Sequence, residues 1–235
     1  MGGDLFPFLF FGGFILLAIV GVGASIWWEK KRREKLRAIA HDMGLSFEAK
    51  AGRPDGFGFG VCPLFNRGRS RKVSNLMHGT VADVELSLFD YRYTTGSGKN
   101  SSTHRRTVAA FEMTAHHLPQ FELGPEGFFH RIASMLGFDD IDFDTHPTFS
   151  EKYRLRSDNE AAVRDLFKPT LLEFFEQQAD QRWTVEAIGS WVVVYRSRGR
   201  IKPDQWPQFL DDTFVVMNAL TPGTPSGDEN RGMFS

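Results

Sequence analysis

Cysteine is almost absent from this 235-residue sequence, which contains only Cys62. A single thiol cannot form an intramolecular disulfide, and it cannot supply the paired cysteines of a structural zinc site. The seven histidines do not recur at the spacings of a zinc site either. Because domains of this size in oxidising compartments usually carry cysteine pairs, the lone cysteine favours a reducing compartment.

The sequence also lacks an excess of either charge. Its 28 basic and 29 acidic residues give a formal net charge of −1, and the sequence pI is about 6.7. Domains that hold nucleic acid through its phosphates carry a clear basic excess. We therefore expect no nucleic-acid partner.

No local catalytic motif is complete. A G-x-S-x-G nucleophile elbow does not occur. Residues 94–99 resemble a phosphate loop, but Tyr93 stands where the first glycine is required and Asn100 follows the lysine. We therefore predict no catalytic residue and no cofactor, while a triad assembled from distant residues stays beyond the reach of sequence reading.

One acidic series has the spacing of a calcium loop. Asp140, Asp142 and Asp144 match alternate ligand positions of an EF-hand, but position six is Thr145 and position eight is Pro147. An edge strand with the intervening apolar residues facing inward explains the same pattern. We therefore predict no bound metal.

Charge is missing altogether from residues 5–28, which read LFPFLFFGGFILLAIVGVGASIWW. As a helix these 24 residues extend roughly 36 Å, enough to cross a hydrocarbon core of about 30 Å. A cleaved signal peptide would have a basic flank before a shorter apolar stretch, whereas MGGD contains no Lys or Arg. The sequence therefore predicts a retained transmembrane helix at 5–28.

A basic segment follows this helix immediately. We expect 29–44 to continue as a juxtamembrane helix that stops at Gly44. Positive flanks stay cytoplasmic, so we expect a single-pass protein of the cell membrane with its N-terminus outside and its C-terminal domain in the cytoplasm. The residues expected to contact anionic lipid headgroups are Lys30, Lys31, Arg32, Arg33, Lys35 and Arg37.

Residues 45–221 suffice for one cytoplasmic α+β domain, with a disordered tail at 222–235. The patterns predict a strand at 46–50 and a long hairpin from strands at 79–94 and 104–114. A helix at 124–137 with Pro125 in its first turn and an extended segment at 139–157 should follow. The rest of the domain should contain a helix from a capping box at 157–160 that kinks at Pro169, a second hairpin at 183–198 and a closing helix at 203–220. Antiparallel hairpins packed with amphipathic helices indicate an α+β fold, organised either as one unit or as two hairpin-helix halves.

Two polar segments are candidates for recognition. The tip of the first hairpin offers a recognition loop formed by Thr95, Gly96, Ser97, Gly98, Lys99 and Asn100. A second basic cluster is formed by Arg67, Arg69, Arg71 and Lys72. This cluster is either a solvated loop, a contact with the membrane surface or a site for an anionic partner.

The stretches FDYRYTTGSGKNSSTHRRTVAAF, LPQFEL and HPTFSEKYRL resemble a group of bacterial membrane-anchored proteins. The resemblance covers roughly residues 44–195. It implies a bacterial origin and a cytoplasmic membrane, and it brings no activity, ligand or catalytic residue.

These observations favour a non-enzymatic, membrane-anchored protein whose cytoplasmic domain binds anionic lipids and a protein partner. The alternative is a membrane-tethered hydrolase or transferase acting on a lipid or envelope precursor, which a pocket lined by Asp90, His104 or His146 would favour. Gly21 and Ser25 form a small-xxx-small pair, so assembly of two or more copies through the span is a third hypothesis.

Overall fold

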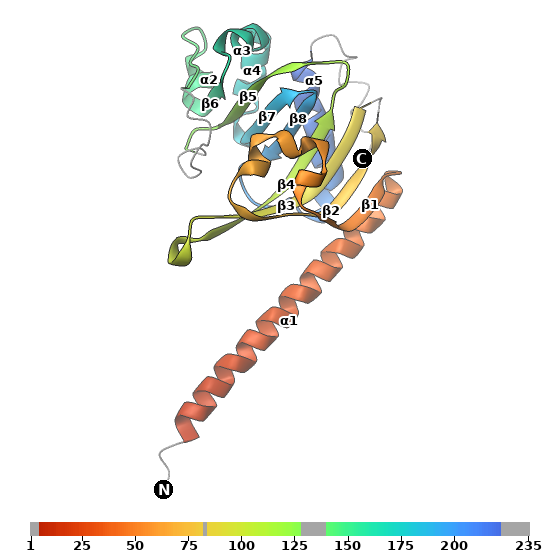
Figure 1. Ribbon diagram of the computed structural model, residues 1–235, viewed down its shortest axis with the longest axis vertical. Helices are drawn as coiled ribbons and strands as arrows, with labels where there is room; N and C mark the ends of the chain where they lie inside the picture. The colour runs from red at the N-terminus through yellow and green to blue at the C-terminus, as the bar shows by residue number, and fades with distance from the viewer. Residues whose placement is uncertain (1–4, 82–83, 128–139, 222–235) are drawn as a thin grey trace.

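The computed structural model describes residues 5–81, 84–127 and 140–221, with side chains described from Ile15 onward. The chain forms an eight-stranded antiparallel sheet packed with helices, from which a long N-terminal helix projects (Figure 1). The predicted α+β class is therefore confirmed. The expected tail at 222–235 lies outside the described residues.

Helix α1 covers Leu5–Asp42 and joins the two helical segments expected there into one. It ends where Gly44 adopts a φ of +69°, a conformation that glycine reaches without steric cost. Leu36 and Ala40 are fully buried and belong to the core of the sheet domain. Within the part of the chain that the structure describes, no helix combines the length and hydropathy of a membrane span.

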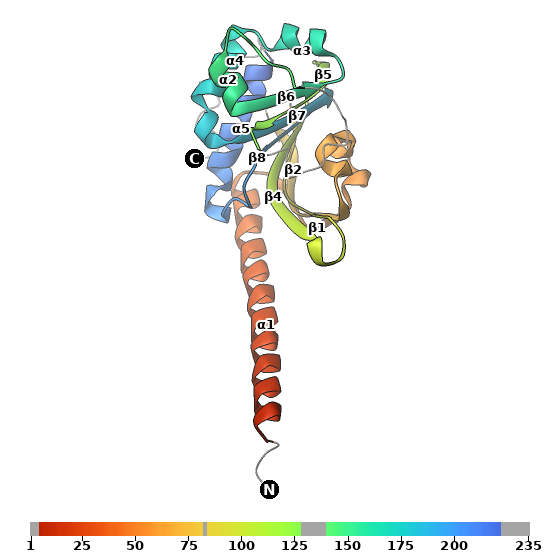
Figure 2. The same cartoon turned by 90° about the vertical axis from the view of Figure 1, so that its left-hand side faces the viewer.

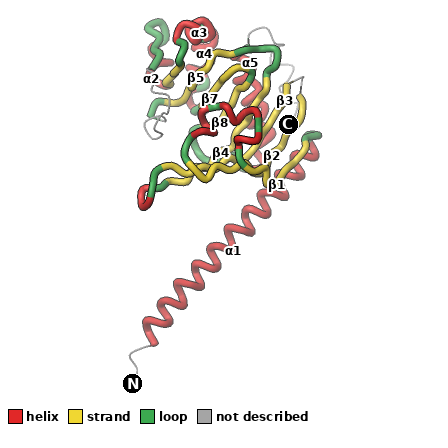
Figure 3. Tube along the Cα trace, in the orientation of Figure 1, coloured by secondary structure: helices red, strands yellow, loops and turns green. Residues whose placement is uncertain are grey.

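The sheet is continuous, with strand order β1-β2-β3-β4-β8-β7-β5-β6. Its strands are β1 Ser46–Gly52, β2 Arg69–Val81, β3 Val84–Thr95, β4 Ser102–Glu112, β5 Leu118–Pro125, β6 Tyr153–Ser157, β7 Trp183–Gly189 and β8 Trp191–Arg196. Both predicted hairpins are present as β3–β4 and β7–β8, and they pair with each other through β4 and β8. The first strand predicted at 79–94 was too long, because residues 79–81 end β2 and β3 begins at Val84. Figure 3 shows this layer of strands in yellow.

Different elements cover the two faces of the sheet (Figure 2). The helices are α2 Pro147–Lys152, α3 Glu160–Leu166, α4 Pro169–Gln177 and α5 Trp206–Leu220. Short 3₁₀ turns are η1 Pro54–Gly56, η2 Gly58–Val61, η3 Pro63–Asn66, η4 Gly98–Asn100, η6 Ala179–Gln181 and η7 Pro203–Gln205. The segment η1–η3 covers one face, and α4 and α5 cover the other.

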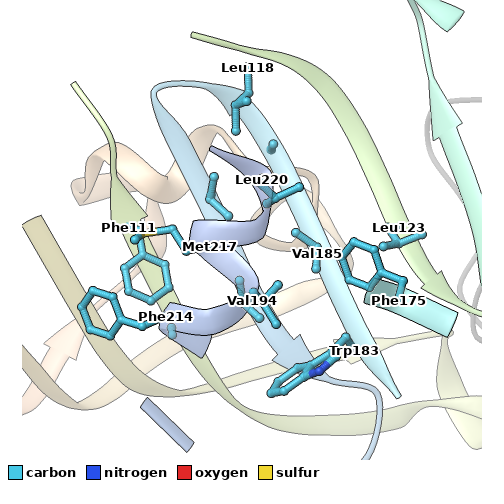
Figure 4. Close-up of a cluster of buried hydrophobic side chains, with 14 of the residues drawn as sticks. Phe111, Leu118, Leu123, Phe175, Trp183, Val185, Val194, Phe214, Met217 and Leu220 are labelled. Carbon is cyan, nitrogen blue, oxygen red and sulfur yellow. The ribbon is translucent and has the colours of Figure 1, made fainter. Parts of the chain in front are cut away.

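The larger core lies between α5 and the sheet (Figure 4). Phe214 and Met217 of α5 are buried with Phe111 of β4 and Val194 of β8. The rings of Phe111 and Phe214 meet edge to face, with centroids 5.0 Å apart. Full burial of each such side chain stabilises the fold by about 1.5–3 kcal/mol, so the closing helix predicted at 203–220 is held mainly by its apolar face.

A second core on the opposite face holds η1–η3 against the sheet. Phe59 stacks on Phe89 of β3 with ring centroids 4.7 Å apart, and Phe65 meets Tyr91 edge to face. All four side chains are buried. The glycine-rich segment that contains η1–η3 is therefore an ordered cover of this face.

Three sequence expectations are corrected. Pro125 does not open a helix but ends β5 opposite Tyr153 of β6, so the first hairpin is followed by a strand; residues 128–137 lie outside the description. Because both hairpins share one sheet, two separate hairpin-helix halves are not formed. The segment 139–157 is extended only in part, because it contains α2.

The helix expected to kink at Pro169 is broken there. Asn159 caps α3 by accepting a hydrogen bond from the Ala162 backbone N–H at 3.1 Å. Lys168 is extended, with ψ of 164°, and Pro169 begins α4. A residue before proline avoids the helical conformation, so the chain restarts rather than bends.

Candidate functional site: a basic cavity beside the α1–sheet contact

Helix α1 meets the sheet at Asp90, a side chain of β3 that is 3% exposed. The Asp90 carboxylate accepts hydrogen bonds from Nε and Nη2 of Arg32 at 2.8 and 2.9 Å. Arg32 also donates to the carbonyl oxygen of Ile201 at 2.8 Å, and its guanidinium lies over the Trp206 ring. This bidentate ion pair fixes both the position and the direction of α1.

Neighbouring strands supply further donors to Asp90. Asn75 has φ of +52° at an irregularity in the β2–β3 register, and a bulge of this kind re-aims a side chain. Its Nδ2 donates to Asp90 at 2.9 Å, and the Thr107 hydroxyl of β4 donates at 3.2 Å. Asp90 is therefore a fully partnered buried charge, which is the condition under which burial is tolerated.

A second ion pair reinforces the contact. Arg200 donates to both carboxylate oxygens of Glu29 on α1, at 3.1 and 2.6 Å, and its Nη1 lies 3.7 Å from Asp90. The hydrogen bond from Arg200 lowers the pKa of Glu29, with smaller contributions from Arg32 and Arg105. Glu29 therefore stays ionised and paired near neutral pH.

A cavity of about 220 Å³ opens beside these pairs, between α1 and strands β1–β4. Its charged lining consists of two carboxylates, Glu29 and Asp90, and six cations, Arg33, Lys50, Lys72, Arg92, Arg105 and Arg200. Both carboxylates are engaged by Arg32 and Arg200. Among the described residues, the other five cations of this basic cavity form no ion pair.

Three of these cations face one another across the sheet. Lys72 of β2 lies opposite Arg92 of β3, and Arg92 lies opposite Arg105 of β4. Like charges at directly opposed positions destabilise a sheet. Arg92 and Asp90 are two residues apart and therefore project to the same face, the one that α1 contacts. The row is thus a concentration of positive charge that the fold itself does not neutralise.

The residues predicted to contact the membrane are divided by this arrangement. Arg32 and Arg33 are half-buried: Arg32 binds Asp90, and Arg33 lines the basic cavity. Lys35 is exposed and forms an ion pair with Asp204. Part of the basic run therefore holds the helix to the domain.

The other three predicted contact residues are exposed to solvent. Lys30 and Lys31 are exposed, and the Lys31 ammonium lies 5.2 Å from the centre of the Trp27 ring. Arg37 is also exposed, with its guanidinium 5.5 Å from the ring centre of Phe47. These side chains are accessible to a surface beside α1.

The predicted recognition loop, residues 95–100, forms the tip of the β3–β4 hairpin and contains η4. All of it except Thr95 is exposed. The Thr95 hydroxyl lies 2.8 Å from Nε2 of His104, which stacks on Tyr93. In both views the tip extends toward the same end of the molecule as the N-terminal part of α1 (Figures 1 and 2).

Arg67 of the second basic cluster is buried, so the surface roles considered for it are wrong. Its Nη2 lies 2.7 Å from Glu122 of β5 and 2.9 Å from Glu186 of β7. Glu186 also accepts from the Tyr195 hydroxyl at 2.9 Å and from the Leu64 backbone N–H at 2.6 Å. Burial, together with the Glu186 charge, raises the pKa of Glu122 to about 7. The buried cluster of Arg67, Glu122 and Glu186 therefore holds η3 against the sheet.

The acidic series at 140–144 takes a structural role in part. Asp140 forms ion pairs with Arg154 and Arg156 of β6, while Asp142 and Asp144 are exposed. Across the residues that the structure describes, no three His, Cys, Asp or Glu side chains gather as they would around a metal ion.

Sequence reasoning named Arg33, Lys72 and Asp90 as candidates for three different sites, but it did not predict that they line one cavity. One signal was available, because the predicted hairpin places Arg92 and Arg105 on facing strands. The contributions of Lys50 and Arg200 had no signal, since they come from a distant strand and a loop near the C-terminus.

The chain matches no protein-family model, and no curated protein matches it. Its fold is similar to the crystal structure of the mycobacterial trehalose monomycolate transport factor A, with a TM-score of 0.59 and 13% sequence identity. The match covers 83% of this chain and 96% of that chain. At this identity the likeness concerns the fold alone.

Proposed function

We propose that this protein is anchored in a membrane by α1 and presents its α+β domain at the membrane surface as a binding module. The observation that carries the proposal is the surface of α1 from Ile15 to Trp28. The large apolar side chains there are 55–72% exposed and are distributed around the helix. Such a helix is stable in hydrocarbon and costly in water.

The basic run gives the proposed anchor its orientation. Positive charge follows the apolar segment and is absent before it, so the N-terminus would lie outside and the domain in the cytoplasm. The Arg32–Asp90 and Glu29–Arg200 pairs make α1 and the sheet one unit. From Trp28 to Arg32 a helix rises about 6 Å. The domain would therefore sit directly at the headgroup layer, with anionic lipids and a protein partner as its ligands.

The lining of the site favours binding over catalysis. A hydrolase or transferase would need an available acid or base, whereas Asp90 accepts hydrogen bonds from Arg32, Asn75 and Thr107. His104 and His146 do not line the basic cavity.

Alkaline extraction of membranes that contain the full chain tests the anchoring. The wild type should stay in the membrane pellet, and the double variant Ile19→Asp/Val22→Asp should be released, since each buried aspartate opposes insertion by roughly 3 kcal/mol. The matched control Thr148→Asp/Thr170→Asp adds the same charge at exposed positions of α2 and α4, and it should stay in the pellet. Release of the wild type would refute anchoring.

A fusion reporter at each end of the chain tests the orientation. Neutralising Lys30, Lys31, Lys35 and Arg37 with glutamine should weaken or invert it. Arg32 is kept, because its loss would break the pair with Asp90. An unchanged reporter signal would show that these charges do not set the orientation.

A further inference from the structure

We propose that the basic cavity binds the phosphate of an anionic phospholipid headgroup. The inference rests on the proposed anchoring for the source of the phosphate, while the chemistry of the cavity stands on its own lining. The inference goes beyond a general attraction of α1 to the membrane, because it names one ligand and one site on the sheet domain.

The charge balance of the lining favours an anion. Arg33, Lys50, Lys72, Arg92 and Arg105 line the cavity, and none of them has a carboxylate partner within the described ranges. The carboxylates of Glu29 and Asp90 offset them only in part, because Arg200 and Arg32 already engage these groups.

The row of Lys72, Arg92 and Arg105 costs stability when the cavity is empty, because like charges are held at opposed positions. Lys50 of β1 lies opposite Ser74 of β2 and extends the positive lining to the next strand. A bound anion turns this repulsion into attraction, so the same row stabilises the complex.

The donor types suit phosphate. Guanidinium groups bind phosphate oxygens through paired hydrogen bonds, and ammonium groups bind them as point charges. Nε of Arg33 is shielded from solvent and has no acceptor in the described part of the chain. At about 220 Å³ the cavity is smaller than the roughly 300–1,000 Å³ of pockets that enclose whole drug-sized ligands. It therefore fits one small anionic group.

The location favours a lipid as the source of that group. Glu29 and Arg33 belong to the first turns of α1 after Trp27 and Trp28, which are 55% and 63% exposed. Exposed tryptophans at the end of an apolar helix prefer the depth of the headgroups. A cavity formed by the next turn opens where lipid phosphates are concentrated.

Calorimetric titration of the full chain in a non-ionic detergent tests the proposal. The ligands are dihexanoyl phosphatidylglycerol, dihexanoyl phosphatidylcholine and inorganic phosphate. We expect saturable binding of phosphatidylglycerol, weaker binding of zwitterionic phosphatidylcholine and weaker binding of free phosphate. Arg92→Gln/Arg105→Gln should reduce the affinity for phosphatidylglycerol roughly tenfold or more.

The matched control is Lys31→Gln/Arg37→Gln, which removes two positive charges from α1 outside the cavity. It should stay within about twofold of the wild type. The cavity variant should also fold, because Arg92 and Arg105 are exposed and their replacement relieves repulsion; its ligand-free melting temperature should equal or exceed that of the wild type.

Three results would overturn the proposal: no saturable binding of phosphatidylglycerol, equal loss of affinity in both double variants, or inorganic phosphate binding at least as tightly as the lipid. The titration contains no bilayer, so its failure is separable from failure of anchoring. Wild type released by alkaline extraction, together with saturable lipid binding, would refute the anchor and support the cavity.

Discussion

Arg32 and Asp90 are 58 positions apart in the sequence and form the bidentate ion pair that joins α1 to the sheet. Their side chains are 12% and 3% exposed. Because Asp90 is buried, its carboxylate cannot turn to water when the pair is broken. The pair therefore helps to set the direction in which α1 leaves the domain, together with the Glu29–Arg200 pair and the buried Leu36.

Arg32→Ala should lower the free energy of unfolding by roughly 3 kcal/mol, since it leaves the Asp90 carboxylate buried without its main partner. Asn75 and Thr107 still donate to Asp90, so the domain should remain folded. Chemical denaturation of the full chain in detergent, followed by tryptophan fluorescence, measures the loss.

Lys35→Ala is the matched control one turn further along α1. Lys35 pairs with Asp204, but the two side chains are 51% and 67% exposed. An exposed pair contributes less than about 1 kcal/mol. Equal losses in the two variants would contradict the assignment of the Arg32–Asp90 pair as the main contact.

The helices and strands that depend on local hydrophobic periodicity were predicted from the sequence. The 3.6-residue period of 203–220 and the strand runs around residues 94–104 and 189–190 became α5 and the two hairpins. Pro125 shows the limit: the sequence around it reads as a helix start, but pairing with Tyr153 makes it the end of a strand. The pairing of two distant strands cannot be predicted from the sequence of either strand alone.

The burial of the Arg67 charge could not be predicted from the sequence either. Arg67 stands in a glycine-rich, basic stretch typical of a solvated loop, yet it is 4% exposed. Its partners, Glu122 and Glu186, come from two strands more than fifty residues away. Only the sheet order brings them together, so no spacing rule could have nominated this cluster.

Gly68→Ala should destabilise the protein by roughly 2–4 kcal/mol. Gly68 has φ of +63°, and a Cβ atom there would lie 2.3 Å from the carbonyl oxygen of Thr94. Backbone strain and a clash with backbone therefore add. Thermal unfolding of the full chain in detergent measures the effect.

Gly98→Ala separates the two causes. Gly98 has φ of +54°, but a Cβ atom there meets nothing within 4 Å. This variant should lose only the conformational term of roughly 1 kcal/mol. If both variants lose the same amount, the close approach of Gly68 to β3 has no energetic consequence.

Limited proteolysis should find the hairpin tip first. Within residues 45–127, the first tryptic cut should follow Lys99, which lies in the exposed turn η4. Lys99→Gln should remove that fragment pair, and Lys152→Gln, at an exposed position at the end of α2, should leave it unchanged. An earlier cut elsewhere in 45–127 would contradict the prediction, and mass spectrometry of the fragments decides.

The buried Glu122–Arg67–Glu186 cluster predicts a pH dependence of stability. The pKa of Glu122 is raised from 4.5 to about 7 by burial and by the neighbouring Glu186 charge. Between these values the folded state binds more protons than the unfolded state, so the free energy of unfolding falls as pH rises through this window. Glu122→Gln removes the titrating group and should flatten that slope, measured by denaturation at intervals from about pH 5 to about pH 8.

The sign of the difference between the two proteins tests the cause. Near pH 5 Glu122 is protonated in the folded state, and glutamine resembles it, so the stabilities should be close. Near pH 8 the wild type holds two buried carboxylates against one guanidinium, whereas the variant holds a single Arg67–Glu186 pair. The variant should then be the more stable protein by something on the order of 1–3 kcal/mol. The control Glu85→Gln, at an exposed position of β3, should have the same pH dependence of the free energy of unfolding as the wild type. If Glu122→Gln also has the wild-type pH dependence, the Glu122 carboxyl does not titrate in this window.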